Sequence, residues 1–182
     1  EPAASRSDLE LESAAVVILA HNRAADLRTC LESLLSLPEI ALFKVHISLD
    51  DPDSWEAMTT VAQEVANSKK VEISVWHVEA RVLDLSKHNQ ETLRWFKMNA
   101  GKIAHHYWEA FERAFMEHSY ENVIFVEEDL IFSPDFLSLF RSTASVLDKD
   151  PSLWCVGAWN DFGYTGVATD DCRLQRTSYF PG

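Results

Sequence analysis

Several motifs that mark common enzyme classes are missing from this chain of 182 residues. Only 5 glycines occur, and neither a Gly-x-Gly-x-x-Gly run nor a P-loop is present, which argues against a classical dinucleotide or ATP cradle. The Gly-x-Ser-x-Gly turn of many hydrolases is absent too. No Cys-x-x-Cys pair or His/Cys cluster has the spacing of a zinc site. The chemistry must be sought in other residue patterns.

Basic residues and long apolar runs are also scarce. The chain has 16 Lys and Arg against 29 Asp and Glu, a net charge of −13, so nucleic acid is not an expected partner. The longest apolar run, Ala14–Ala20, is far shorter than the roughly 20 residues of a membrane span. We expect no membrane contact by this chain and place any anchor or targeting segment outside it. An apolar content of 47% predicts a folded domain.

The three cysteines cannot all pair with one another. Cys30 falls on the apolar stripe of a predicted helix, which favours a buried free thiol. Cys155 and Cys172 can pair with each other, with other chain, or not at all.

Strand-like and helix-like segments alternate along the chain. Apolar runs predict strands at 14–20, 44–50, 71–78, 122–126 and 153–159, and periodic patterns predict helices at 26–37, 54–67, 99–118 and from Ser133-Pro134-Asp135 to about 150. The 133–150 helix is expected to bury Phe136, Phe140, Ala144 and Leu147. Residues 1–12 read as a mobile lead-in, and 79–96 as a long connection. Such alternation predicts an α/β fold with a mostly parallel, twisted sheet and helices on both faces.

Polar clusters follow three of the predicted strands, where a parallel sheet places its ligand crevice. They are His21-Asn22-Arg23, Asp50-Asp51-Pro52-Asp53 and Glu127-Glu128-Asp129. Polar groups at three neighbouring strand ends favour one site over three unrelated loops.

The acidic triplet predicts a divalent-metal site. If the strand continued, Glu127 and Asp129 would share a side, with Glu128 opposite. Carboxylates suit Mg²⁺ or Mn²⁺, which often bind through one or two carboxylates plus substrate phosphates. An incomplete cage of this kind is what a nucleotide-sugar transferase requires, because the metal offsets charge on the departing diphosphate. A solvated turn is the alternative.

Three further residues are candidates for nucleotide contacts. Arg23 can grip phosphate or ribose, or simply pair with Asp26. Asp50 can accept the N–H of a pyrimidine base, or act as a turn residue. His106 borders the apolar stripe of the 99–118 helix and can face the crevice, although a packing role is equally simple. The pair Asn160-Asp161 can reach a sugar or serve a turn, and core packing is expected to bury Trp154 or Trp159.

Five segments, in order and approximate spacing, make the chain resemble the β-1,2-N-acetylglucosaminyltransferase family over about residues 14–182. They are LAHNRAADLRTCLESLL (19–35), KIAHHYWEAF (102–111), VEEDLIFSPDF (126–136), DPSLWCVGAWNDFGY (150–164) and QRTSYFPG (175–182). The DPSLWC…AWND run is long and specific, whereas the acidic triplet alone is a weak signal.

The resemblance implies a GT-A type fold and inverting, Mn²⁺-dependent transfer of N-acetylglucosamine from UDP-GlcNAc to a mannose residue in β-1,2 linkage. By motif position, Asp129 would bind the metal, Glu127 and Glu128 would contact ribose or donor sugar, Arg23 and Asp50 would hold the nucleotide, and His106 would lie near the donor. It also implies a Golgi-lumenal, type II membrane protein with its anchor outside this chain, and a Cys155 whose disulfide partner lies downstream.

The resemblance leaves the acceptor open. Glu-Glu-Asp is the triplet of the family's O-mannose enzymes, whereas the 102–111 and 150–156 segments are closer to its N-glycan enzymes, which we favour. Residues 13–182 are expected to form the donor-binding portion, C-terminally truncated, with the acceptor portion and catalytic base missing. Two alternatives remain: a non-catalytic module that binds nucleotide sugar or glycan, and a phosphotransferase, which lacks a visible phosphate cradle.

Overall fold

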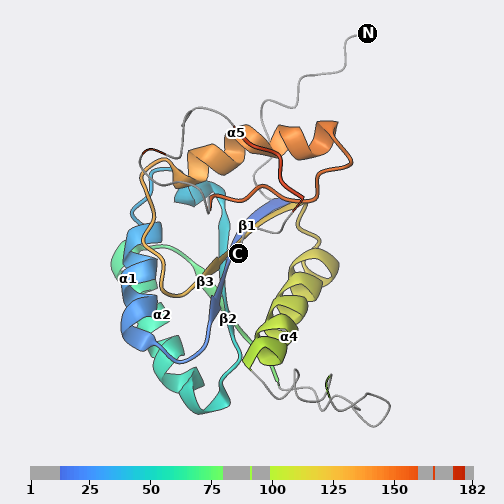
Figure 1. Ribbon diagram of the computed structural model, residues 1–182. Helices are drawn as coiled ribbons and strands as arrows, with labels where there is room; N and C mark the ends of the chain where they lie inside the picture. Colours follow the sequence, from blue (N-terminus) through green and yellow to red (C-terminus); the bar gives the residue numbers. More distant parts are fainter. Residues whose placement is uncertain (1–12, 80–90, 92–98, 160–165, 167–173, 179–182) are drawn as a thin grey trace. The chain divides into compact units, whose positions relative to one another are not determined.

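The computed structural model describes residues 13–79, 91, 99–159, 166 and 174–178 (Figure 1). The predicted lead-in, most of the 79–96 connection, Cys172, Asn160-Asp161 and the final residues lie outside this part. The chain divides into two compact units, which meet in sequence between Leu137 and Ser138.

The first unit is built on a parallel sheet. Its described strands are β1 (Ala14–Ala20), β2 (Lys44–Leu49), β3 (Ile73–His77) and β4 (Asn122–Glu127), in the order β3-β2-β1-β4. All three pairings are parallel, and β1 has a neighbour on each side. The predicted strand at Ala14–Ala20 is confirmed residue for residue. The other three predicted strands are confirmed to within two residues at each end.

Helices cover both faces of this sheet (Figure 1). On one face lie α1 (Ala24–Leu34) and α2 (Trp55–Lys69), and on the other lies α4 (Asn99–Glu112), which continues as a π-helical turn over Arg113–Glu117. Short 3₁₀ turns at Ile40–Leu42 and Pro52–Ser54 precede β2 and α2. The predicted α/β class with helices on both faces is therefore confirmed.

β1 is buried on both sides, as its continuous apolar run predicts. Val17 and Leu19 pack with Ala110 and Ala114 beneath α4, while Val16 and Ile18 are fully buried. Leu27, Leu31 and Leu34 of α1 are buried as their spacing predicts. Cys30, on the same stripe, is a buried free thiol, and burial raises its pKa to about 12.

The second unit differs from the prediction. The helix predicted from Ser133-Pro134-Asp135 is α5 (Phe136–Lys149), which begins at the end of the first unit, two residues after Pro134. Ser133 Oγ donates to Asp135 Oδ1 at 2.6 Å in the turn before it. The four residues expected to be buried on it are all half-buried, whereas the fully buried positions are Leu137 and Thr143.

The fifth strand predicted at 153–159 is wrong, since the structure has no strand there. Trp154 and Trp159 are 69% and 68% exposed, so the expected burial of one of them is wrong too. A short apolar run shows only that a segment is hydrophobic. A strand also needs a neighbouring strand that pairs with its backbone N–H and C=O groups. Cys155, in the same segment, is a half-buried free thiol.

An aromatic cluster with a buried histidine lies between the sheet and the end of α4. His46 of β2 stacks on Trp76, with ring centroids 4.3 Å apart, and its Nε2 is 2.7 Å from Tyr120 Oη. His118 stacks on Trp76 and Arg113 covers the same ring. Burial, with the charges of His118, Arg113 and Lys44, lowers the pKa of His46 to about 4.

This cluster predicts loss of stability in acid. Because the pKa of His46 lies below its ordinary 6.5 in the folded chain, the unfolded chain binds the proton more readily, and stability falls as pH drops from about 6.5 towards 4. Between pH 7 and pH 4.5, wild type should lose roughly 2 kcal/mol more unfolding free energy than His46→Phe, measured by urea unfolding. Equal losses in the two proteins would contradict this.

Candidate functional site

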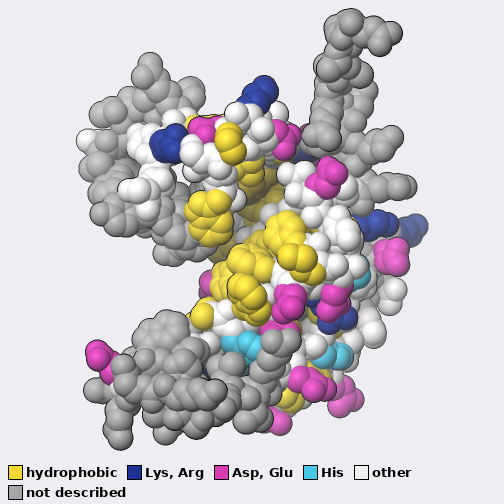
Figure 2. Space-filling model, turned by 90° about the vertical axis from the view of Figure 1, so that its right-hand side faces the viewer, with side chains coloured by type: hydrophobic (Ala, Val, Ile, Leu, Met, Phe, Trp, Pro, Cys, Tyr) yellow, Lys and Arg dark blue, Asp and Glu magenta, His cyan; other side chains and the backbone are white. Residues whose placement is uncertain are grey.

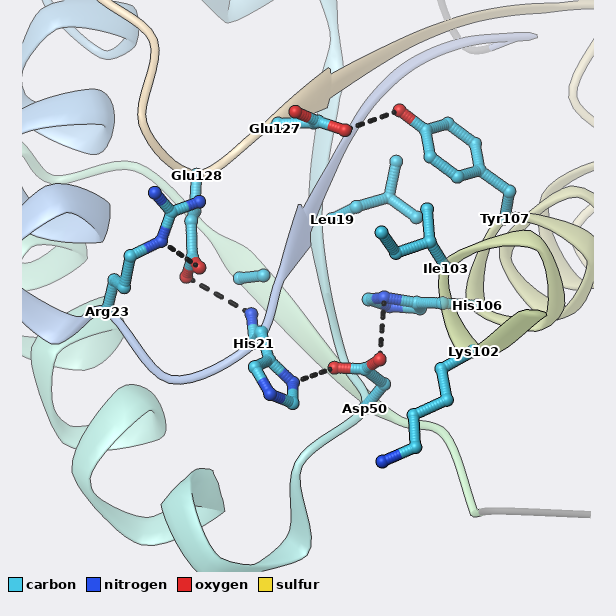
Figure 3. A pocket seen from close by; sticks show the side chains of 11 residues that line it. Leu19, His21, Arg23, Asp50, Lys102, Ile103, His106, Tyr107, Glu127 and Glu128 are labelled. Atoms are coloured by element: carbon cyan, nitrogen blue, oxygen red, sulfur yellow. Dashed lines mark hydrogen bonds and ion pairs between the residues drawn. The ribbon is translucent and has the colours of Figure 1, made fainter. Parts of the chain in front are cut away.

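A pocket of about 300 Å³ opens at the carboxyl edge of the sheet, between the strand ends and α4 (Figure 3). It lies wholly within the first unit. Its lining combines carboxylates, basic groups and a few apolar side chains: Leu19, Ala20, His21, Arg23, Asp50, Lys102, Ile103, His106, Tyr107, Glu127 and Glu128.

Strand register explains why the polar clusters meet. Ala20 lies opposite Leu49 in β2, and Leu19 lies opposite Glu127 in β4. The three strands therefore end at the same level of the sheet. The predicted convergence of three strand ends is confirmed. Of the six predicted site residues, Arg23, Asp50, His106, Glu127 and Glu128 line the pocket. Asp129, the predicted metal ligand, is not among the lining residues and is connected to them through Arg23.

Arg23 joins the two acids that follow β4. Its Nε donates to Glu128 Oε1 at 3.1 Å and its Nη1 to Asp129 Oδ2 at 2.9 Å, and these bonds raise the pKa of the guanidinium. Asp26, the partner weighed as an alternative, lies 3.8 Å from Nε. Glu128 is only 2% exposed, so the arginine neutralises a buried carboxylate.

The expected alternation of the acidic triplet is wrong. Glu128 and Asp129 share Arg23, whereas Glu127 points elsewhere and accepts a hydrogen bond from Tyr107 Oη at 3.1 Å (Figure 3). The reason is that β4 ends at Glu127 and the next two residues form a turn, which cancels the two-residue period of a strand. Burial raises the pKa of Tyr107, so the phenol stays a donor to Glu127.

Asp50 lies between two histidines. Its Oδ1 accepts a hydrogen bond from His21 Nδ1 at 2.7 Å, and its Oδ2 is 3.4 Å from His106 Nδ1. His106 is buried, and its Nε2 is 2.9 Å from Ser48 Oγ. Desolvation lowers the pKa of His106, so it is a neutral ring at pH 7.

The residues present fit a metal that takes most of its ligands from a substrate. Within the described residues there is no group of three or more His, Cys, Asp or Glu side chains arranged to hold an ion. Asp129 is 38% exposed, and Arg23 binds only its Oδ2, so Oδ1 remains a possible ligand. One carboxylate completed by phosphate and water is a usual Mg²⁺ or Mn²⁺ arrangement.

Sequence reasoning missed four residues of this arrangement. Lys102 and Tyr107 lie in the 102–111 family segment but were given no role at the site, and His21 was recognised only as part of a polar cluster. Ser48 had a readable signal: with His46 and Asp50 it alternates along β2, so three polar groups share the face towards α4.

Ile103 shows that the apolar stripe of α4 is not entirely buried in the core. Its helical spacing from Tyr107 and Ala110 predicts that it lies on the apolar stripe of the helix, yet it is 53% exposed and lines the pocket. Figure 2 shows the α4 side of the molecule, where hydrophobic side chains gather next to acidic ones. Trp108, Phe115 and Met116 are other exposed hydrophobic residues of α4 and the π-helical turn. No described helix is long and apolar enough to cross a membrane.

A parallel sheet with helices on both faces and a carboxylate-rich pocket at its carboxyl edge defines an α/β protein with a ligand site at its strand ends, consistent with the expected GT-A type fold. Within that class, the model of the GNT-I family matches residues 3–182, and the chain belongs to this family. The resemblance identified from the sequence motifs is thereby confirmed.

One curated relative is the alpha-1,3-mannosyl-glycoprotein 2-beta-N-acetylglucosaminyltransferase of Arabidopsis thaliana. It is 27% identical over 179 residues, which cover 95% of this chain. The aligned region is 37% of the relative's own length, so the chain spans little more than a third of it.

Proposed function

We propose that this chain forms the donor-binding part of an inverting, Mn²⁺-dependent transferase. The enzyme would move N-acetylglucosamine from UDP-GlcNAc to a mannose residue in β-1,2 linkage. The observation that carries the proposal is the convergence of Arg23, Asp50, His106 and Glu127 on one pocket at the sheet edge. Family membership and the activity in the relative's name support it. By the same analogy the protein would work in the Golgi lumen.

Each pocket residue has a chemical task in this proposal. Asp50 accepts the imide N–H of uracil, because an ionised carboxylate can only accept. Glu127, oriented by Tyr107, is available to accept a hydroxyl of the ribose or the donor sugar. Glu128 has both oxygens engaged, by Arg23 and by the His21 amide, so its first task is to hold Arg23 in place.

Mn²⁺ would be held by Asp129 together with the donor diphosphate. When bound, it supplies Lewis-acid stabilisation of the charge that develops on the departing diphosphate. Arg23 adds a guanidinium next to Asp129, a donor that suits phosphate as well as carboxylate.

Transfer also needs a base that deprotonates the mannose hydroxyl as it attacks the anomeric carbon. Asp50 and Glu128 are already engaged by basic partners and Glu127 by a phenol, so we assign none of them this role. We propose that residues 1–182 bind the donor but do not complete transfer.

A transfer assay tests whether the chain binds the donor without completing transfer. With radiolabelled UDP-GlcNAc, Mn²⁺ and α-mannosyl acceptors of N-glycan or O-mannose type, the 182-residue chain should give no product above background. A longer form of the protein should glycosylate the N-glycan acceptor preferentially. Robust turnover by the 182-residue chain would contradict the proposal that it does not complete transfer. Tight, metal-independent glycan binding without donor binding would instead support a non-catalytic module.

A further inference from the structure

We propose that His21 is a positioning residue that orients Asp50, and that this orientation sets the pocket's preference for uracil over cytosine. The inference rests on the proposed function, because it assumes that a pyrimidine nucleotide enters this pocket. It concerns an arrangement of this chain's own side chains.

His21 connects two acidic strand ends across the strand between them. It follows β1, which lies between β2 and β4 in the sheet. Its backbone N–H donates to Glu128 Oε2 at 3.1 Å, and its side-chain Nδ1 donates to Asp50 Oδ1 at 2.7 Å (Figure 3). The hydrogen bond to Glu128 anchors the backbone of His21. It therefore limits the positions from which the imidazole can reach Asp50.

A second histidine constrains Asp50 from the other side. His106 Nδ1 lies 3.4 Å from Oδ2, close enough to restrict rotation of the carboxylate. His106 Nε2 lies 2.9 Å from Oγ of Ser48, which is fully buried, and this hydrogen bond holds the imidazole in place. The imidazoles of His21 and His106 therefore flank Asp50, one hydrogen-bonded to Oδ1 and the other 3.4 Å from Oδ2.

The consequence is base selectivity. A carboxylate whose Oδ1 is bound by His21 and whose Oδ2 faces His106 has a restricted rotation, so its free lone pairs keep a fixed orientation towards the base. Uracil presents an N3–H donor that matches these lone pairs. Cytosine presents an N3 lone pair, which the carboxylate repels. Removal of His21 frees Oδ1 and should weaken the match to uracil more than the poor match to cytosine.

His21 is suited to this test because its side chain is half exposed and carries no core packing. His21→Ala and His21→Phe both remove the donor, and the second keeps the volume of the ring. His21→Asn places an amide N–H close to the position of Nδ1 and should restore the bond. His105→Ala is a matched control, since His105 lies on the same helix as His106 but does not line the pocket.

The experiment measures the affinities of the chain for UDP and for CDP by isothermal titration calorimetry, both in the presence of Mn²⁺. Wild type and His105→Ala should prefer UDP. His21→Ala and His21→Phe should lose about tenfold in UDP affinity, with little change for CDP, and His21→Asn should recover most of the loss. Thermal midpoints should agree within a few degrees, which separates positioning from folding.

An unchanged ratio of UDP to CDP affinity in both His21→Ala and His21→Phe would overturn the inference and leave the proposed function intact. Failure of wild type to bind UDP at all would instead overturn the proposed function, and the inference with it.

Discussion

Arg23→Ala is expected to destabilise the fold and to abolish nucleotide binding together. Glu128 is 2% exposed and depends on the Arg23 guanidinium for its neutralisation. Removal of one partner of a buried pair leaves an uncompensated charge, which typically costs several kcal/mol. Because Arg23 itself is half exposed, we expect a loss of about 3 kcal/mol in unfolding free energy, measured by urea denaturation.

Two comparisons identify the cause of that loss. Arg23→Ala should cost much less in a Glu128→Gln background, where no buried charge is left behind, and this coupling is measurable in a double-mutant cycle. Arg28→Ala is the matched control, because Arg28 pairs with Glu64 on the exposed side of α1 and α2 and should cost under about 1 kcal/mol. Similar costs for the two arginines would show that burial of Glu128 is not the cause.

Asp129→Ala is expected to remove Mn²⁺ binding in the presence of UDP. Asp129 is exposed and keeps an oxygen that Arg23 does not bind, whereas Glu127, the other exposed acid of the triplet, accepts a hydrogen bond from Tyr107. If a single protein carboxylate anchors the ion and the diphosphate supplies much of the rest, loss of that carboxylate should weaken binding by about a hundredfold or more. Electron paramagnetic resonance of free Mn²⁺, titrated with protein and UDP, measures this directly.

The Asp26→Ala variant distinguishes the loss of a metal ligand from the loss of a negative charge near Arg23. Asp26 is another half-exposed carboxylate near Arg23, at 3.8 Å, but it lies on α1 and not in the acidic triplet that follows β4. Its removal should leave Mn²⁺ binding within about twofold. Equal losses in Asp26→Ala and Asp129→Ala would point to the summed negative charge of this edge and against a ligand at Asp129.

The bounds of β1 were predictable because this strand is buried on both faces. A run such as Ala14–Ala20 has no exposed side to interrupt it, so its bounds follow from hydrophobicity alone. The 153–159 segment has a similar run, LWCV, and forms no strand. Pairing depends on which chain lies alongside, and hydrophobicity carries no information about that neighbour. The same limit applies to α5, where the pattern marked Phe136 and Ala144 and burial fell on Leu137 and Thr143.

The sequence predicted that the three polar strand ends meet, but not which side chains contact one another there. Residues at neighbouring carboxyl ends must meet, and Arg23, Asp50 and Glu128 do. Which acid Arg23 binds depends on the turn after Glu127, whose geometry the strand period does not describe. His21 was invisible as a bridge because its two partners are 29 and 107 residues away and belong to different strand ends.

Calorimetric titration of the unmodified chain with UDP-GlcNAc, in Mn²⁺ and again in excess EDTA, tests the central claim most directly. A donor-binding pocket that shares its metal with the diphosphate predicts saturable one-to-one binding in Mn²⁺ that disappears in EDTA. Binding of equal strength in EDTA, or no binding under either condition, would contradict the assignment of this pocket to a nucleotide sugar.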